Sequence, residues 1–238
     1  MAAKWEERRF TRYQMALPLR YRGVDPPAAA VPAGWTRDLG SGGACIELDE
    51  RIPAQGVLRL RFQTEEGTIE SDARVIWDRQ PPLPESGCLH GVAFTQLAPD
   101  QLASLRTLLL AQKPWLPARG RLPANLLVVC RPTRPARPPL RGQIGNLSRG
   151  GFSLLLPKIL LPCTTLEVFA PTPTGTLMLT GAIAWVDRSA NEAFGRPIWH
   201  GVRLTARDWP TALTLARFLT ELPASAPRSF PASRMTPP

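Results

Sequence analysis

The chain has 238 residues, of which 44% are hydrophobic and 20% are charged, and it carries a net charge of +10 at pH 7. This length suits two domains of about 100 residues, each large enough to bury a core. The sequence holds no run of about 18 apolar residues, and its charged N-terminus lacks the apolar core of a signal peptide. We therefore expect a cytoplasmic protein without a transmembrane segment.

The positive charge is unevenly distributed along the chain. Residues 1–112 hold 13 Lys/Arg and 14 Asp/Glu, a net charge of −1, whereas residues 113–238 hold 16 and 5, a net charge of +11. No acidic residue lies between Asp100 and Glu167. Such a field favours a polyanionic partner, which includes nucleic acid, a nucleotide, an acidic protein and an anionic lipid surface. Only three of the 29 basic residues are lysine; this suits guanine and phosphate recognition, but genomic base composition explains it equally well.

Short runs in the first half alternate between apolar and polar residues, which predicts strands. The predicted strands are residues 16–22, 44–48, 57–62, 69–77 and 90–94. Residues 24–34 are rich in proline and alanine and are expected to form a loop. A helix is predicted over residues 98–110, because Pro99 stands in its first turn and leucines recur on one face.

The second half repeats this order of elements. The predicted strands are residues 126–130, 152–156, 165–169, 176–185 and 200–204, and a helix is expected over residues 209–222. Each half thus predicts a small closed antiparallel barrel with a C-terminal helix. We place the first domain at residues 1–112, a linker at 113–124, the second domain at 125–222 and a disordered tail at 223–238.

Three sequence motifs occur twice, in the same order. Residues 38–46 are echoed by 146–154 at an offset of 108, residues 75–79 by 184–188 at 109, and residues 90–94 by 200–204 at 110. Three matches in register over more than fifty residues indicate a duplicated domain. The differences between the two copies then become informative about function.

No arrangement of residues typical of a catalytic site occurs in either copy. The two histidines, His90 and His200, occupy equivalent positions and are interpreted as structural residues near strand ends. The four cysteines are widely separated and are expected to be small buried hydrophobic residues, and no cluster of metal ligands is present. Trp77 and Trp185 are predicted to lie in the cores. We therefore expect a protein that is not an enzyme and that binds neither metal nor cofactor.

Residues 8–12 have the pattern Arg-x-x-x-Arg, and Asp38 and Gly43 frame a later turn. Together with the Gly91-x-x-Phe94 pattern, this set resembles the PilZ domain, whose hallmarks are Arg-x-x-x-Arg and [Asp/Asn]-x-Ser-x-x-Gly on a six-stranded barrel. The resemblance covers residues 6–110 and, less completely, 120–220. It implies a mainly β chain of two tandem six-stranded barrels and a bacterial receptor for cyclic di-GMP that controls motility, biofilm or polysaccharide output.

The resemblance also implies which residues bind this ligand. They are Arg8, Arg9, Arg12, Asp38, Ser41 and Gly43 in the first copy, and Asn146, Ser148 and Gly151 in the second. In this assignment Arg8 and Arg12 hold guanine or phosphate, and Asp38 contacts a guanine edge. Arginine pairs with the O6 and N7 atoms of guanine and stacks on the base, so the assignment agrees with the chemistry of the ligand.

Each copy departs from the family pattern. In the first copy Gly40 replaces the motif serine, and Ser41 stands one position later. In the second copy the serine is present, but Pro117 and Arg121 stand where the arginine pair is expected. Arg8, Arg9 and Arg12 could also form a solvated basic terminus, and the motif residues could serve only their turns, with Asp38 and Asn146 bonded to the backbone and the glycines at positive φ.

Three functions follow from these patterns. The first is a receptor in which the first copy binds cyclic di-GMP and the second modulates it or docks a protein partner. The second is a degenerate scaffold that binds proteins and no nucleotide. The third, nucleic-acid binding through residues 119–149, is disfavoured because this stretch has few aromatic side chains for stacking. The pattern leaves the regulated pathway and the oligomeric state open.

Overall fold

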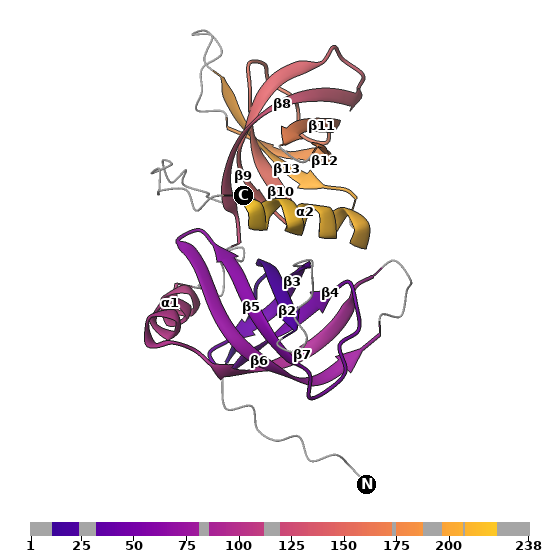
Figure 1. The fold of residues 1–238 in the computed structure, drawn as a ribbon. Coiled ribbons are helices and arrows are strands. Elements are labelled where there is room, and N and C mark those ends of the chain that lie inside the picture. The colour runs from indigo at the N-terminus through magenta and orange to yellow at the C-terminus, as the bar shows by residue number, and fades with distance from the viewer. Residues whose placement is uncertain are drawn as a thin grey trace.

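The computed structural model describes residues 11–23, 32–80, 86–111, 120–172, 175–187, 197–206 and 208–222. These residues form two antiparallel β-barrels in series, each followed by a helix, and Figure 1 shows one barrel stacked on the other. The fold class predicted from the sequence is confirmed. Among the described residues, no helix has the length and apolar character needed to cross a membrane.

The first barrel is a ring of six strands with a short seventh strand attached. Its strands are β1 (Arg12–Gln14), β2 (Pro18–Gly23), β3 (Ala33–Gly40), β4 (Gly43–Leu48), β5 (Val57–Thr64), β6 (Gly67–Arg79) and β7 (Cys88–Gln96). The ring runs β3-β2-β5-β6-β7-β4 and closes through the pairing of β4 with β3. β1 pairs with the end of β3 that β2 does not reach. Helix α1 (Pro99–Leu110) follows and buries Leu105 and Leu109 against this core.

The second barrel repeats this arrangement with six strands. They are β8 (Leu122–Arg134), β9 (Leu140–Ser148), β10 (Gly151–Leu156), β11 (Thr165–Thr172), β12 (Gly175–Val186) and β13 (Ile198–Leu204), in the closed order β10-β13-β12-β11-β8-β9. Helix α2 (Trp209–Glu221) comes last, and the side chain of Asp208 caps it by accepting a hydrogen bond from the Thr211 amide at 2.9 Å. This is a usual helix start.

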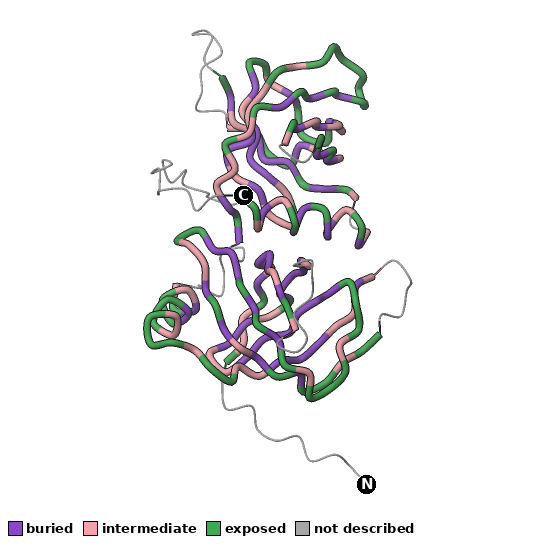
Figure 2. Tube along the Cα trace, in the orientation of Figure 1, coloured by how far each residue is buried: buried purple, intermediate pink, exposed green. Residues whose placement is uncertain are grey.

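Side chains alternate between the barrel interiors and the surface, as Figure 2 shows along the strands. On β5 the inward residues Leu58, Leu60 and Phe62 are buried and their neighbours Arg59 and Arg61 are exposed. This period of two is the pattern from which the strands were predicted.

Helix α2 belongs to the second barrel but also covers a face of the first (Figure 1). Trp35 on β3 points out of its own barrel into the hydrophobic core that α2 completes, and it is fully buried there. Its Nε1 donates a hydrogen bond to the Ala212 carbonyl at 2.7 Å. At the two ends of the helix, Arg20 is paired with Glu221 at 3.1 Å and Trp209 donates to Asp49 at 2.9 Å. The two barrels therefore share one packed interface.

Several elements differ from the predictions. Strands β1, β3 and β9 were not predicted, and residues 33 and 34, expected in a loop, begin β3. β8 begins at Leu122, three residues before the expected start of the second domain. The remainder of the expected loop, residues 24–31, and the expected disordered tail from residue 223 lie outside the described residues.

The two tryptophans expected in the cores lie on the surface, with exposed fractions of 41% for Trp77 and 36% for Trp185. Each stands opposite a glycine of the neighbouring strand, Gly91 or Gly201. A Cβ on either glycine would come within 2.0 Å of the indole nitrogen, so the ring lies directly on the glycine backbone. This pairing also corrects the repeat: Trp77 is equivalent to Trp185, at an offset of 108 rather than 109.

The histidines and cysteines also have defined environments. His90 and His200 are fully buried, and the Nε2 atom of each accepts a hydrogen bond from a backbone amide, of Ile52 or Leu160, which confirms their structural role. Cys45 and Cys130 are buried as expected. The expectation is wrong for Cys163, which is exposed in a turn, and Cys88 is only partly buried.

Candidate functional site

The candidate site of the first barrel lies on its outer face, at the β3–β4 hairpin. A β-bulge between Thr36 and Asp38 turns the Asp38 side chain toward β4. There its Oδ1 accepts a hydrogen bond from the Cys45 amide at 3.0 Å. Asp38 is thus hydrogen-bonded to the backbone, as the interpretation of Asp38 as a turn residue predicted. The bond runs from strand β4 to strand β3, however, and does not lie within a turn.

Arg12 is the second residue of this site. It begins β1 opposite Gly40, and its Nη1 lies 3.0 Å from Asp38 Oδ1. The two side chains are 29% and 28% exposed, so the pair faces solvent while the Asp38 carboxylate is held on two sides. The arrangement presents guanidinium N–H groups at a fixed position on the barrel surface, which suits a planar or phosphate acceptor. Arg8 and Arg9, predicted to act with Arg12, lie outside the described residues.

The replacement of the motif serine by Gly40 has a structural reason. A Cβ at position 40 would lie 2.7 Å from the Thr11 carbonyl oxygen and 3.2 Å from Cγ of Arg12. The glycine therefore allows β1 to approach β3 closely enough to bring Arg12 to Asp38. Ser41 lies in the turn that follows and is partly exposed.

Gly43 and Gly151 serve close packing between strands. A Cβ at either position would come within 2.1 Å of a carbonyl oxygen on the adjacent strand, that of Val92 or Val202. Neither glycine has a positive φ, so the interpretation that they supply a left-handed turn is wrong. Their identity is explained by the fold of the hairpin, whether or not a ligand binds.

The equivalent hairpin of the second barrel is bonded differently. The Asn146 amide donates to Ser153 Oγ at 3.0 Å, and Ser148 Oγ donates to the Gly151 carbonyl at 2.8 Å. The buried Asn146 Oδ1 has no hydrogen-bond partner among the described residues. Register places Arg121 at the position of Arg12, because Pro123 faces Asn146 as Gln14 faces Asp38. The structure describes seven of the nine predicted residues, and it keeps these seven in two separate groups, one on each barrel.

Sequence reasoning missed the contact that joins this second hairpin to the first barrel. Arg149, in the turn between Ser148 and Gly151, lies with Nη1 2.7 Å from Oε2 of Glu47 on β4, which is only 3% exposed. Arg37 of the first barrel lies 2.9 Å from the same oxygen. The Arg149 guanidinium also lies over the Trp35 ring, 5.6 Å from its centre. Burial lowers the pKa of Arg149, and the Glu47 carboxylate opposes this shift.

This contact is next to the candidate site. Glu47 follows Cys45 by two residues on β4, so both side chains lie on the outer face that carries Asp38. Burial, with Asp38 as the second cause, raises the pKa of the Cys45 thiol to about 11, and the thiol is neutral at physiological pH. The motif turn of the second barrel therefore borders the Arg12–Asp38 pair of the first.

Arg12 and Asp38 line none of the three hollows found on the described surface. These hollows lie beneath α1 near Gly120, beside Asp72 and Gln96, and between α2 and the β11–β12 turn. No group of three or more His, Cys, Asp or Glu side chains among the described residues could hold a metal ion. The pair is suited to a flat ligand held by hydrogen bonds and stacking.

Residues 6–111 match the family model of the PilZ domain. The first barrel is a PilZ domain. The matched range contains the Arg-x-x-x-Arg pattern, Asp38 and Gly43, and it ends at the end of α1. The resemblance inferred from the sequence is confirmed for this part of the chain, and no curated protein matches the sequence.

Several solved structures are similar to the chain. The PlzA protein of Borreliella burgdorferi, described in complex with cyclic di-GMP, is 10% identical with a TM-score of 0.38, over 89% of this chain and 94% of that one. The PilZ domain of YcgR from Escherichia coli, described with cyclic di-GMP, is 15% identical with a TM-score of 0.35, over 44% and 91%. The PilZ domain of CeSA from a cellulose-synthesizing bacterium is 20% identical with a TM-score of 0.33, over 42% and 95%.

Proposed function

We propose that the chain is a non-enzymatic receptor for cyclic di-GMP, in which the PilZ domain binds the ligand and the second barrel transmits the signal to a protein partner. The observation that carries this proposal is the Arg12–Asp38 pair at 3.0 Å on the outer face of the PilZ domain. Arg12 is the second arginine of the pattern that the family uses for guanine and phosphate, and Asp38 stands at the acidic position of the second motif.

The chemistry of the ligand agrees with this pair. Cyclic di-GMP carries two phosphates and two guanines, and an arginine donates two hydrogen bonds to the O6 and N7 atoms of guanine. A carboxylate accepts hydrogen bonds, and so it complements the N–H groups on the Watson–Crick edge of guanine. Ligand binding at this face would exchange part of the Arg12–Asp38 contact for contacts with the nucleotide. Arg8 and Arg9 belong to the same proposed site, with Ser41 and Gly43 at its floor.

We infer that the second barrel does not hold a nucleotide of its own. Its motif turn contacts Glu47 through Arg149, and Pro117 stands where the first arginine of the pair is expected. Asn146, Ser148 and Gly151 are thereby assigned to the hairpin and to the interface of the barrels. The alternative function, a degenerate scaffold that binds proteins without nucleotide, is favoured by the same turn and by the glycine at position 40.

Isothermal titration calorimetry of the full chain with cyclic di-GMP separates these two functions. We expect one molecule of ligand per chain, and Arg12→Ala is expected to weaken binding by about 1–3 kcal/mol, or roughly 5- to 150-fold. Arg59→Ala is the matched control, because Arg59 is also paired with an aspartate, Asp72 at 2.7 Å, on another face of the same barrel. It should bind like the wild type. No heat and no thermal shift at about 100 μM ligand would establish the scaffold instead.

A further inference from the structure

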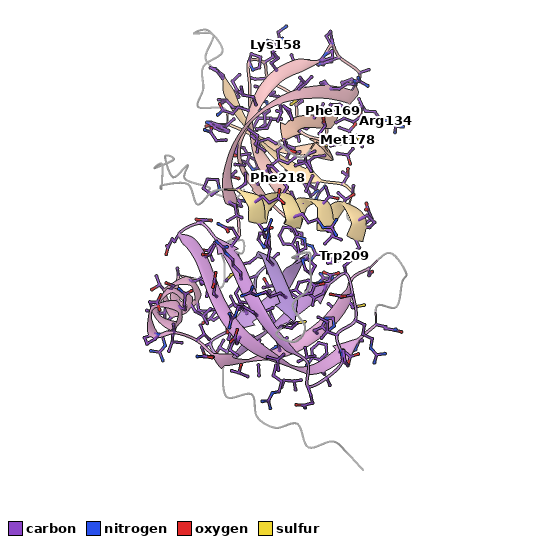
Figure 3. All side chains as sticks on the ribbon, in the orientation of Figure 1. Arg134, Lys158, Phe169, Met178, Trp209 and Phe218 are labelled. Atoms are coloured by element: carbon purple, nitrogen blue, oxygen red, sulfur yellow. The ribbon has the colours of Figure 1, made fainter. Side chains whose placement is uncertain are left out.

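The outer face of the second barrel carries a row of apolar side chains across three strands. Val129 on β8 pairs with Phe169 on β11, which pairs with Met178 on β12. Val129 and Met178 are 44% and 58% exposed, Phe169 is partly exposed, and Leu127, two residues before Val129 on β8, is 74% exposed. We call these four residues the apolar stripe; Figure 3 labels Phe169 and Met178 on the flank of this barrel.

The first barrel shows that the fold does not require this stripe. The hairpin pairs Thr64–Gly67 and Thr172–Gly175 fix an offset of 108 between the copies. Phe169 and Met178 therefore correspond to Arg61 and Glu70, which are paired at 3.6 Å on the surface of the first barrel. One copy thus has an ion pair where the other exposes a phenylalanine and a methionine. Exposed apolar side chains at positions where the sister domain carries an ion pair indicate an interaction surface.

Arginines border the apolar stripe. The Arg131 guanidinium lies over the Phe169 ring at 5.7 Å from its centre, and Arg141 on β9 faces Val129 across the strand pair. Arg134 lies at the end of β8 on the same side of the barrel (Figure 3). Glu167, 3.8 Å from Arg131, is the first acidic residue after Asp100. Exposed Phe, Met and Arg together are the composition typical of the centre of a protein interface.

The corresponding face of the first barrel already receives a helix. By register, Arg20 on β2 corresponds to Val129, because Tyr21 faces Leu60 as Cys130 faces Val168. Arg20 contacts Thr220 and Glu221 of α2, which packs across β2, β3 and β5. This outer face of the first barrel therefore packs against a helix that crosses three strands. In the second barrel the equivalent strands are β8, β9 and β11; β8 carries Leu127 and Val129, β11 carries Phe169, and β9 carries no residue of the stripe.

We propose that the apolar stripe of the second barrel docks an amphipathic helix of a partner protein, whose apolar face covers Leu127, Val129, Phe169 and Met178 and whose flanking carboxylates pair with Arg131 and Arg141. The sister face with α2 favours a helix, and the charge of +11 on residues 113–238 favours acidic flanks and opposes the docking of a second copy through the same face. In the proposed cyclic di-GMP receptor, the apolar stripe is the surface that contacts the protein partner. The observations that define the stripe do not depend on nucleotide binding.

The test uses a fluorescent, conformationally stapled peptide of about 15 residues with a leucine face and glutamates on both flanks. Its binding to the full chain is followed by fluorescence anisotropy in the absence of cyclic di-GMP, so that failure here is distinct from failure of the nucleotide site. The decisive variant is Phe169→Arg with Met178→Glu, which installs the residues of the first barrel. Circular dichroism and the melting temperature check that the variant folds. The matched control, Arg61→Ala with Glu70→Ala, changes the equivalent positions of the first barrel.

We expect the wild type and the control to bind the peptide equally and the double variant to bind at least about tenfold more weakly. A peptide with lysines in place of the glutamates should bind more weakly as well. No binding of the acidic peptide at about 100 μM, or equal binding by the double variant, would overturn the proposal. Stripe-dependent binding to vesicles of phosphatidylcholine and phosphatidylglycerol at about 3:1, without peptide binding, would assign the surface to a membrane instead. Concentration-dependent self-association that the double variant abolishes would assign it to a second copy.

Discussion

The Arg149 guanidinium of the second barrel lies 2.7 Å from the Glu47 carboxylate of the first, and both groups are largely shielded from water. A buried carboxylate is costly unless cations compensate it, and here Arg149 and Arg37 both do so. The motif turn of one copy is thereby used to hold the other copy in place. This relationship makes the interface between the barrels a polar as well as an apolar contact.

Arg149→Ala should lower the free energy of unfolding by about 1–3 kcal/mol, because it leaves Glu47 buried with one cation in place of two. Urea denaturation followed by circular dichroism measures this change. Adding Glu47→Gln to the variant should restore part of the loss, since the neutral amide needs less compensation. Wild-type stability of Arg149→Ala would show that the ion pair does not hold the barrels together.

Trp35→Phe should destabilise the interface by about 1–2 kcal/mol, because it removes a buried hydrogen bond to the Ala212 carbonyl and part of a fully buried ring. Thermal unfolding is the measurement. Trp77→Phe is the matched control, since that indole is 41% exposed and belongs to the first barrel alone. A larger loss of thermal stability in Trp77→Phe than in Trp35→Phe would contradict the inference that the core shared by the two barrels stabilises the chain.

Gly40→Ser restores the serine of the family motif, yet it should destabilise the chain and weaken nucleotide binding. The new Cβ would lie 2.7 Å from the Thr11 carbonyl, so β1 must move away and carry Arg12 from Asp38. Overpacking of this kind costs about 1–3 kcal/mol. Ser148→Gly, at the equivalent position of the second barrel, serves as the comparison and should leave nucleotide binding unchanged. Tighter binding by Gly40→Ser would show that β1 does not set the position of Arg12.

The stability of the chain should fall as the pH drops below about 6.5. Burial lowers the pKa of both His90 and His200, so each imidazole is neutral in the fold at a pH where the unfolded chain already binds a proton. Asp78 and Glu50 oppose the shift at His90, whereas Arg51 adds to it. The contribution of His90 and His200 to stability is therefore present above the histidine pKa of the unfolded chain, and it is lost as the pH falls below that value.

Urea denaturation between about pH 7 and pH 5 isolates this histidine effect, because the pKa values of Asp72, Asp78, Asp100 and Asp208 are lowered from the ordinary value of aspartate, about 3.9, which already lies below this range. Their stabilising effect is lost only in that lower range. A free energy of unfolding that stays constant from pH 7 to pH 5 would contradict the burial of neutral imidazoles.

The sequence was sufficient to predict the two barrels, because the repeated motifs and the period-two alternation each report local structure directly. Strands β3 and β9 were missed because the motif around Asp38 and Asn146 is rich in turn-forming residues, although β3 continues through Asp38 to Gly40 and β9 through Asn146 to Ser148. The tryptophans were misplaced because an apolar ring lying on a glycine of the next strand has the same sequence signature as a core residue.

The interface between the barrels could not be predicted from either copy alone. Arg149 follows Trp35 and Glu47 by more than 100 residues, and each of the three is ordinary in its own strand or turn. The signal lay in the differences between the copies: Trp35 corresponds by register to Gln143, and Arg61 corresponds to Phe169. Positions at which one copy of a duplicated barrel changes from polar to apolar mark the faces where something docks.

We propose that the chain holds one cyclic di-GMP site, at Arg12 and Asp38 of the PilZ domain. Amide NMR spectra recorded during a ligand titration test it most directly, because the Cys45 amide donates to Asp38 at 3.0 Å and Ser153 is its equivalent in the second barrel. We expect the Cys45 resonance to shift in proportion to occupancy and the Ser153 resonance to stay in place. A shift at Ser153 with none at Cys45, or no shift at either residue, would contradict the account.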